Sequence, residues 1–387
     1  MQRYYFDHNA TTPVAPEVLR AMEPCFAEVY GNASSIHYFG QQAKMLVEQA
    51  RRQVSGLLGC RPQEIVFTSG GTEANNLAVL GTARNADRER RHVITTAVEH
   101  PSVLDACRQL QREGVEVTFL RVGSDGVVSP DDVRAALRPE TVLISVMHAN
   151  NETGVIQPLR EIAAIASEAG VALHADGVQS AGKIATGVRE LGADLFSLSG
   201  HKIYGPKGAG ALFVRRGTRI GPVLFGGHHE RDRRGGTENV PGIVGLGAAA
   251  ELARRTLATE TERLAGLRDR LERSLLERLE AAGVNGARAP RVPNTTNVYV
   301  DYLEGESLVI ALDLKGMAVS TGAACSSGAI EPSHVLTAMG LRPERAKASL
   351  RFSLGRQTTS EDIDALLGAV EEVVAHLREL SPCLPRS

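Results

Sequence analysis

One lysine at the end of a predicted strand carries a strong chemical signal. Lys202 follows the apolar segment 194–196, and Ser199 and His201 come just before it. Glycines on both sides allow the backbone to approach a ligand closely. A lysine held in a pocket can lose its proton and attack a carbonyl as an amine, while the serine and the histidine donate hydrogen bonds to an anion. This combination suits an aldehyde cofactor with a phosphate group, pyridoxal phosphate, although a solvated loop lysine fits the same stretch.

Polar residues with similar potential follow other predicted strands. Gly71 and Thr72 begin a helix whose free N–H groups suit a phosphate, and a plain N-cap at Thr72 is the alternative. His100 can stack on a flat ring and titrate near neutrality, or it can bond to the backbone at a helix start. Asn151 lies in the polar stretch 148–154, which fits either a binding site or an Asx turn.

A carboxylate follows the fifth of these strands. Asp176 comes after an apolar run and before a glycine. An unpaired buried carboxylate is costly, so this position needs a cationic partner. A protonated pyridine nitrogen would serve, and the pair would keep the ring an electron sink. Alternatively, Asp176 caps the segment that begins at Val178. Gln179 adds a side-chain amide three residues after Asp176.

Alternating strands and helices must position these residues. Apolar and β-branched runs predict strands at 64–68, 92–96, 116–121, 142–147, 171–174, 194–198 and 209–214. Helical patterns separate most of them, at 72–83, 101–113, 130–138 and 158–169. Such alternation is typical of a mostly parallel sheet with helices on both faces, and ligands bind beyond the carboxyl ends of its strands. The candidate residues lie at those ends: Thr72, His100, Asn151, Asp176, Gln179, Ser199, His201 and Lys202.

The last third of the chain predicts a smaller α+β domain. Helical patterns cover about 241–282, 306–315 and 360–380, and strand patterns cover 297–302 and 349–354. We therefore expect a large α/β domain at residues 15–260. The small domain would combine residues 1–14 with residues 261–387.

One cysteine between the last two predicted strands is placed to react. Cys325 lies in a run of small residues, 320–333, which deny it a core and predict a mobile loop. A reachable cysteine on a flexible arm suits a nucleophile that visits a site and carries cargo away. A buried structural cysteine is the alternative, and that interpretation is kept for the others: Cys25, Cys60, Cys107 and Cys383.

Composition argues against several classes of function. The 387 residues carry a net charge of -2 and no tryptophan, so a nucleic-acid partner is not expected. No apolar run approaches the ~20 residues that span a bilayer, and the N-terminus does not look like a signal peptide. The five cysteines show no C-x-x-C spacing, which argues against a disulfide framework or a zinc site. We expect a cytoplasmic protein with no membrane or nucleic-acid partner.

Taken together, these stretches resemble the cysteine desulfurases of the NifS/IscS family, which are fold-type-I pyridoxal phosphate enzymes. The resemblance rests on segments 5–12, 199–202 and 322–328 and extends over essentially the whole chain. Segments 227–239 and 380–382 look closest to NifS. The resemblance implies a large domain with a mostly parallel seven-stranded sheet and a smaller α+β domain.

The resemblance also implies the cofactor roles. Lys202 would hold pyridoxal phosphate covalently, and His100 would stack on its ring. Asp176 would pair with the pyridine nitrogen, and Gln179 with the phenolate oxygen. In a homodimer, Thr237 would reach the phosphate bound by the neighbouring subunit. The phosphate itself would lie among Gly71, Thr72, Ser199 and His201.

The same resemblance implies the reaction. Arg351 would bind the carboxylate of L-cysteine, and Asn151 would lie beside cofactor and substrate. Cys325 would take the sulfur as a persulfide, leaving L-alanine, while Lys202 and His100 would move protons. A sulfur-acceptor or iron–sulfur scaffold protein would receive the sulfur. No metal is expected in the cofactor site, and Cys325 would be the contact to a nascent iron–sulfur cluster.

Two other interpretations stay open. A selenocysteine lyase or another class-V aminotransferase-like enzyme would share this fold and cofactor, and a lyase acting only on selenocysteine could turn over without Cys325. A non-catalytic binding protein on a decayed enzyme fold is more distant, because Lys202, Asp176 and His100 are all present. The pathway that receives the sulfur is not specified by these residues.

Overall fold

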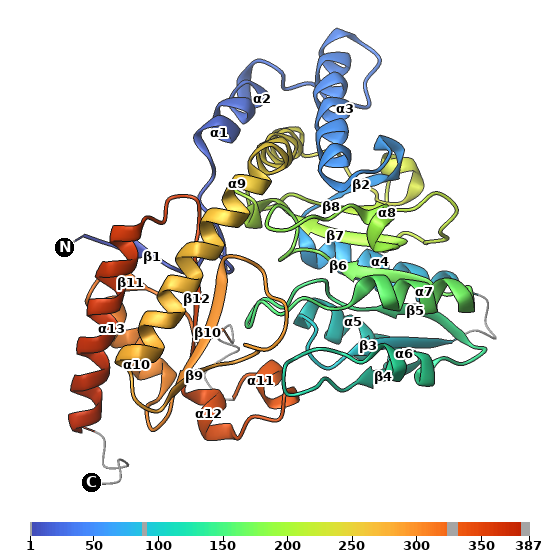
Figure 1. Cartoon of the computed structure of the whole chain (residues 1–387). Helices are drawn as coiled ribbons and strands as arrows, with labels where there is room; N and C mark the ends of the chain where they lie inside the picture. The colour runs from blue at the N-terminus through green and yellow to red at the C-terminus, as the bar shows by residue number, and fades with distance from the viewer. Residues whose placement is uncertain (1, 87–90, 323–331, 381–387) are drawn as a thin grey trace.

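A seven-stranded sheet forms the centre of the larger part of the molecule in a computed structural model (Figure 1). The structure describes residues 2–86, 91–322 and 332–380. The strand order is β2-β8-β7-β6-β5-β3-β4; β8 is antiparallel to both neighbours, and the other four pairs are parallel. The expected α/β fold with a mostly parallel sheet is therefore confirmed. The strands are β2 (Ile65–Thr68), β3 (His92–Thr96), β4 (Glu116–Leu120), β5 (Thr141–Ser145), β6 (Ala172–Asp176), β7 (Leu195–Ser199) and β8 (Gly210–Val214).

Successive side chains alternate between the two faces of this sheet. Val93 and Leu143 belong to the core on one face, whereas the next residues, Ile94 and Ile144, belong to the core on the other. Both faces are apolar because helices cover both. The helices on the first face are α4 (Gly71–Asn85) and α5 (Pro101–Arg112), and those on the second include α6 (Pro130–Ala136), α7 (Leu159–Ala169) and α8 (Val188–Leu191).

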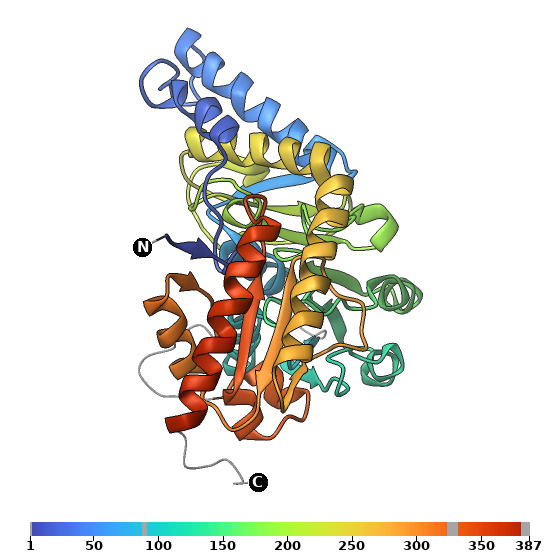
Figure 2. The same ribbon diagram turned by 60° about the vertical axis from the view of Figure 1, so that its left-hand side comes forward.

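A second hydrophobic core surrounds a three-stranded antiparallel sheet in the order β12-β10-β9. Phe6 is buried in this core, while Ala15 belongs to the first one. Figure 2 shows α9 and α13 side by side along this part of the molecule. The division of the chain into domains at 14/15 and 260/261 stays a prediction. It is supported by the residues that make up each of the two cores. The elements are α9 (Val240–Arg278), β9 (Ala282–Val284), β10 (Thr295–Val300), α10 (Gly305–Leu314), β12 (Ser349–Ser353) and α13 (Ser360–Leu380).

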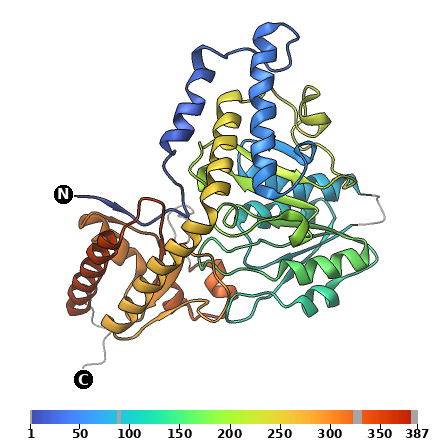
Figure 3. The ribbon, with the colours of Figure 1, turned by 45° about the horizontal axis from the view of Figure 1, so that its top comes forward.

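The N-terminal arm connects the two cores. β1 (Tyr4–Tyr5) pairs in parallel with β11 (Met317–Ala318), and the chain then crosses to the N-terminal helices. Figure 3 shows the first half of α9 between two of them, α1 and α3. The first helical segment is divided into α1 and α2 because Pro24 lacks the N–H that a continuous helix would need. The helices are α1 (Pro16–Met22), α2 (Pro24–Ala27) and α3 (Tyr38–Leu58).

Short helices complete the described part of the chain. The helical pattern expected to reach residue 282 ends at Arg278, and Ala282 instead begins β9 beside β10. Within residues 2–86, 91–322 and 332–380, no helix combines the length and apolarity that a membrane crossing requires. The short helices are η1 (Pro62–Glu64), η2 (Gly200–Lys202), η3 (His229–Asp232), α11 (His334–Ala338) and α12 (Pro343–Lys347).

Candidate active site

A cavity of about 390 Å³ lies at the carboxyl ends of the parallel strands. Strand β6 ends at Asp176 and β7 ends at Ser199, so successive strands deliver these side chains to one place, as the predicted sheet requires. A larger hollow of about 890 Å³ lies at the opposite ends of the strands and is lined by none of the predicted residues. Those that line the smaller cavity are Gly71, Thr72, His100, Asn151, Asp176, Gln179, Ser199, His201, Lys202 and Arg351.

The amine of Lys202 is enclosed by the N-terminal arm. Its Nζ donates to the carbonyl oxygens of Asn9 at 2.5 Å and of Ala10 at 2.7 Å. Burial first, and the positive charge of Arg351 second, lower the pKa of Lys202 to about 8. The interpretation of Lys202 as a solvated loop lysine is therefore wrong. An amine with this pKa is partly neutral near pH 7 and can act as a nucleophile.

Asp176 is fixed by two hydrogen-bond donors. Its Oδ2 accepts from Nδ2 of Asn75 at 2.7 Å, and its Oδ1 accepts from the backbone N–H of Val178 at 3.0 Å. Asp176 thus caps the following turn, as one interpretation expects, and it also lines the cavity. Its pairing with a pyridine nitrogen stays a prediction. Asn75 was not predicted. The sequence signal for Asn75 is its spacing: it lies four residues after Gly71 and therefore on the same face of α4 as Gly71.

His100 is held as a neutral ring. It is the N-cap of α5, and its Nδ1 accepts from the backbone N–H of Ser102 at 3.1 Å. The proton of the neutral ring is therefore on Nε2. Burial lowers the pKa of His100, while the charge of Asp176 opposes this effect. The cap role and the cavity role again coincide in one residue.

The first turn of α4 offers backbone donors at one end of the cavity. The helix begins at Gly71, and its N-cap is Gly70, so the interpretation of Thr72 as the N-cap is wrong. A Cβ built on Gly71 would lie 2.7 Å from Cγ2 of Val178, which explains the glycine. Free N–H groups and the positive helix end favour an anion here.

Ser199 and His201 complete this end of the cavity. Ser199 is the last residue of β7, and its side chain lies 3.8 Å from the Cβ position of Gly70. His201 pairs through Nδ1 with Oγ1 of Thr11 at 3.1 Å. Burial and the charge of Lys202 lower the pKa of His201 to about 4, so it stays a neutral polar group.

Asn9 on the N-terminal arm links several of these side chains, and it was not predicted as a site residue. Its carbonyl oxygen accepts from Nε2 of Gln179 at 3.0 Å as well as from Lys202. Its side chain donates to the carbonyl oxygen of Asn151 at 3.1 Å and accepts from Nζ of Lys183 at 2.9 Å. The polar run of the arm was the only sequence signal for this role.

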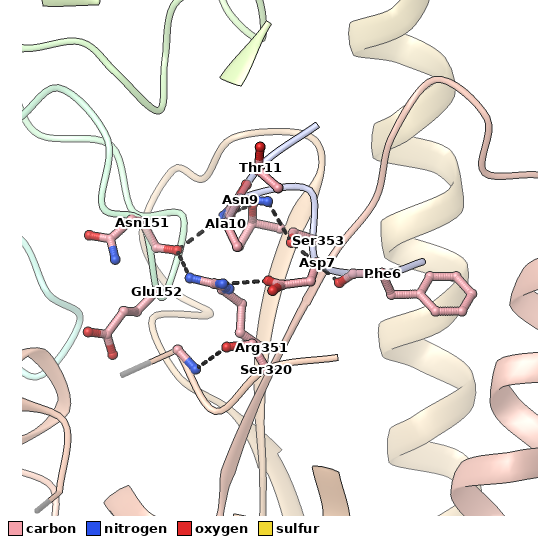
Figure 4. Close-up of polar contacts among 12 residues, drawn as sticks. Phe6, Asp7, Asn9, Ala10, Thr11, Asn151, Glu152, Ser320, Arg351 and Ser353 are labelled. Atoms are coloured by element: carbon pink, nitrogen blue, oxygen red, sulfur yellow. Dashed lines mark hydrogen bonds and ion pairs between the residues drawn. The ribbon is translucent and has the colours of Figure 1, made fainter. Parts of the chain in front are cut away.

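Arg351 enters the cavity from β12 (Figure 4). Its guanidinium donates to Oδ1 of Asp7 at 2.5 Å and to the carbonyl oxygen of Asn151 at 3.0 Å. Its backbone N–H donates to the carbonyl oxygen of Ser320 at 2.6 Å. A buried guanidinium held in this way suits a carboxylate ligand, because its planar fork matches two oxygens.

The neighbouring Asn150 forms the Asx turn that was considered for this stretch. Its Oδ1 accepts from the backbone N–H groups of Glu152 at 2.9 Å and Thr153 at 3.0 Å. The turn presents the carbonyl oxygen of Asn151 to Arg351 and Asn9. Both interpretations of this stretch therefore apply, to adjacent residues.

Two predicted residues are not placed in the cavity. Thr237 is on the surface of the chain, outside the cavity lining. Cys325 lies outside the described residues, so its predicted role is untested. Gly322, three residues before Cys325 in the sequence, lines the cavity.

The residues present fit pyridoxal phosphate. An amine with a pKa near 8 faces the cavity, a carboxylate fixed by Asn75 lies in its wall, and a helix N-terminus supplies donors for an anion. Gly71 leaves no room for a larger side chain at that end, as close approach of a phosphate requires. The buried guanidinium of Arg351 remains for a substrate carboxylate.

Comparisons with known proteins agree with this geometry. The family model for class-V aminotransferases matches residues 4–366. A cysteine desulfurase IscS from Dictyoglomus turgidum is 48% identical over 98% of this chain and 96% of its own length. One from Anaeromyxobacter sp. is 52% identical over 98% of this chain and 94% of its own length.

Solved structures give the same result. A NifS-like protein superposes with a TM-score of 0.90 at 36% identity, covering 97% of this chain and 100% of its own. SspA in complex with cysteine superposes with a TM-score of 0.80 at 36% identity, covering 91% of this chain and 99% of its own. This chain therefore belongs to the class-V aminotransferase family and, within it, to the pyridoxal-phosphate-dependent cysteine desulfurases.

Proposed function

We propose that this chain removes sulfur from L-cysteine and that Cys325 accepts it. The carbon–sulfur bond of the substrate breaks, and a sulfur–sulfur bond forms on Cys325. The released L-alanine contains as many hydrogen atoms as L-cysteine. The observation that carries this proposal is one cavity in which the amine of Lys202, the carboxylate of Asp176 and the guanidinium of Arg351 converge. Gly322 in the same wall leads to Cys325 within three residues.

The side chains divide the work by their chemistry. Bound pyridoxal phosphate supplies a carbonyl that captures amines and a ring that withdraws electrons from the substrate's α carbon. Lys202 would hold the cofactor, and its amine, when free, would take the α proton of the substrate. Asp176 keeps a proton on the pyridine nitrogen, and Arg351 orients the substrate carboxylate. His100, which lines the same cavity, moves a proton to or from a thiol.

The remaining cofactor contacts are assigned from chemistry and position. Gly71, Thr72, Ser199 and His201 hold the phosphate, because all four line the cavity and the first two form the positive end of α4. Gln179 donates to the phenolate oxygen. Asn151 lies beside the substrate.

We also propose a homodimer in which Thr237 reaches the cofactor phosphate of the partner subunit. Large apolar side chains on α2, α3 and their connection are strongly exposed: Phe26 65%, Tyr30 65%, Ile36 94% and Tyr38 70%. Several large apolar side chains exposed within one short segment are typical of a protein interface, and a symmetric dimer is the commonest way to cover them. The exposed place of Thr237 is compatible with a contact across such an interface.

The persulfide sulfur would pass to an acceptor protein or an iron–sulfur scaffold, which follows from the predicted reactivity of Cys325. The expected location is the cytoplasm, as the scattered cysteines indicate. A selenocysteine lyase remains the alternative, since the same cavity would accept selenocysteine.

One assay tests the proposal. Purified protein is incubated with L-cysteine and a thiol reductant, and alanine and sulfide are followed, with Cys325→Ala beside the parent. Equal amounts of alanine and sulfide from the parent, with both lost in the variant, would support the desulfurase. Cys60→Ala is a matched control, because this half-buried cysteine lies outside the cavity lining. Undiminished alanine formation in Cys325→Ala would favour the lyase.

A further inference from the structure

Lys183 lies behind the wall of the active-site cavity and has no role in the reaction described above. It is outside the cavity lining, but its Nζ donates to Oε1 of Gln179 at 2.6 Å and to Oδ1 of Asn9 at 2.9 Å. Both acceptors belong to residues that line the cavity. The hydrogen bonds of its amine therefore connect Lys183 to the site through these two side chains.

The partners of Gln179 allow one orientation of its side-chain amide. Nε2 donates to the carbonyl oxygen of Asn9 at 3.0 Å, and a carbonyl oxygen can only accept. Oε1 faces the amine of Lys183. Turning the amide over would bring two acceptor oxygens together at Asn9. An amide nitrogen carries two N–H groups, so the second one remains for the cavity that Gln179 lines.

We propose that Lys183 is a positioning residue that, by donating to Oε1, keeps an N–H of Gln179 directed at the phenolate oxygen of bound pyridoxal phosphate. This inference rests on the proposed cofactor role of Gln179. Lysine suits the task because its amine carries enough hydrogen atoms to donate to both acceptors. Burial lowers the pKa of Lys183 well below its ordinary value, and the charges of Lys202 and Arg351 lower it further.

Charged and titratable groups of several elements surround this amine. Lys202 of η2 and Arg351 of β12 are cations that disfavour a charge on Lys183. His8 of the arm is neutral near pH 7, because burial and Lys183 lower its pKa to about 4. Glu260 of α9 and Arg356 line a small cavity of about 40 Å³ beside Lys183. The short contacts of Nζ are to the uncharged acceptors of Gln179 and Asn9.

A spectroscopic titration reports on this hydrogen bond without measuring turnover. A donor to the phenolate oxygen stabilises its negative charge, so the bound cofactor loses its proton at lower pH. Without the donor, the pH midpoint of the cofactor's absorbance should rise. One hydrogen bond corresponds to a rise of about 0.5 to 1 pH unit.

The experiment titrates the holoenzyme and three variants by absorbance. Lys183→Met should raise the midpoint, and Gln179→Leu should raise it by a similar amount. The double variant should match Gln179→Leu alone, because Lys183 acts through Gln179. A Lys183→Met shift that persists undiminished in the Gln179→Leu background would overturn the inference, as would no shift at all.

Two further variants make the test specific. Lys315→Met is a matched control whose amine pairs with Glu372 at 2.6 Å, away from the cavity, and its midpoint should equal that of the parent. Lys183→Arg retains donors, so its midpoint should not rise, and a rise would contradict the inference even if Lys183→Met fails to fold. Failure of the proposed cofactor site has a different signature, because the parent would then show no bound-cofactor absorbance, and failure of the proposed reaction alone would appear in the alanine and sulfide assay while the titration stays intact.

Discussion

Asp7 on the N-terminal arm and Arg351 on β12 form a short ion pair, with Oδ1 of Asp7 2.5 Å from the guanidinium. The Arg351 side chain is only 5% exposed and that of Asp7 20%. A second guanidinium nitrogen donates to Asn151 at 3.0 Å. The arm thus fixes the plane of the guanidinium before a substrate arrives, which reduces the entropy lost on binding a carboxylate.

Arg351→Gln tests this binding role. The variant loses a charge-assisted hydrogen bond of about 1.5–3 kcal/mol, so KM for L-cysteine should rise about 10- to 100-fold while kcat changes less. Steady-state alanine formation measures both constants. Arg345→Gln is the matched control, because Arg345 pairs with Asp301 away from the cavity. An unchanged KM in Arg351→Gln would refute the carboxylate contact.

The pKa of Lys202 predicts how the cofactor-free protein captures pyridoxal phosphate. Burial first, and Arg351 second, lower this pKa from 10.5 to about 8. Since only the neutral amine attacks, the rate of covalent capture should rise about tenfold per pH unit below this value and level off above it. The growth of cofactor absorbance after mixing gives the rate. A rate that keeps rising toward pH 10, as for a free lysine side chain, would show that the amine is not perturbed.

The sequence predicted the sheet and most of the cavity because both depend on local patterns. Apolar strands followed by glycine or a polar residue place Asp176, Ser199 and Lys202 at one edge of the sheet, whichever neighbour each strand pairs with. A residue can also have a local role and face the cavity at the same time, since His100 caps a helix and lines the cavity.

The residues that were missed act across long sequence separations. Asn9 bonds to Gln179 and Lys202, which are 170 and 193 residues away, and no local pattern encodes such contacts. Asn75 was in principle detectable, because an amide buried on the inner face of a helix needs polar partners. Lys183 gives no such signal, because a lysine in a turn is usually solvated.

A buried ion pair should stabilise the loop that precedes Thr237. Arg51 and Glu230 form two hydrogen bonds of 2.7 and 2.9 Å, and their side chains are 5% and 3% exposed. Glu230→Gln should lower the free energy of unfolding by up to about 3 kcal/mol, because it removes the buried carboxylate partner of Arg51 and leaves Glu48, whose side chain is 40% exposed, as its ion-pair partner. Urea unfolding at fixed protein concentration measures the change. Asp105→Asn, which breaks the exposed pair with Arg108, should cost about 0.5 kcal/mol or less, and equal losses in the two variants would contradict the prediction.

Glu99 should make stability fall as pH rises. Burial raises the pKa of its carboxyl from 4.5 to about 8, against the opposing bonds from Met147 and Thr96. Between these values the folded chain keeps a proton that the unfolded chain releases, so the unfolding free energy decreases with pH across this window. Glu99→Gln removes the titration but retains an oxygen for both donors. The unfolding free energy of the variant, compared with that of the parent, should therefore increase by about 3 kcal/mol between about pH 5 and about pH 8. Urea unfolding of both proteins at the two pH values measures this difference, and a constant gap between them would show that Glu99 titrates normally.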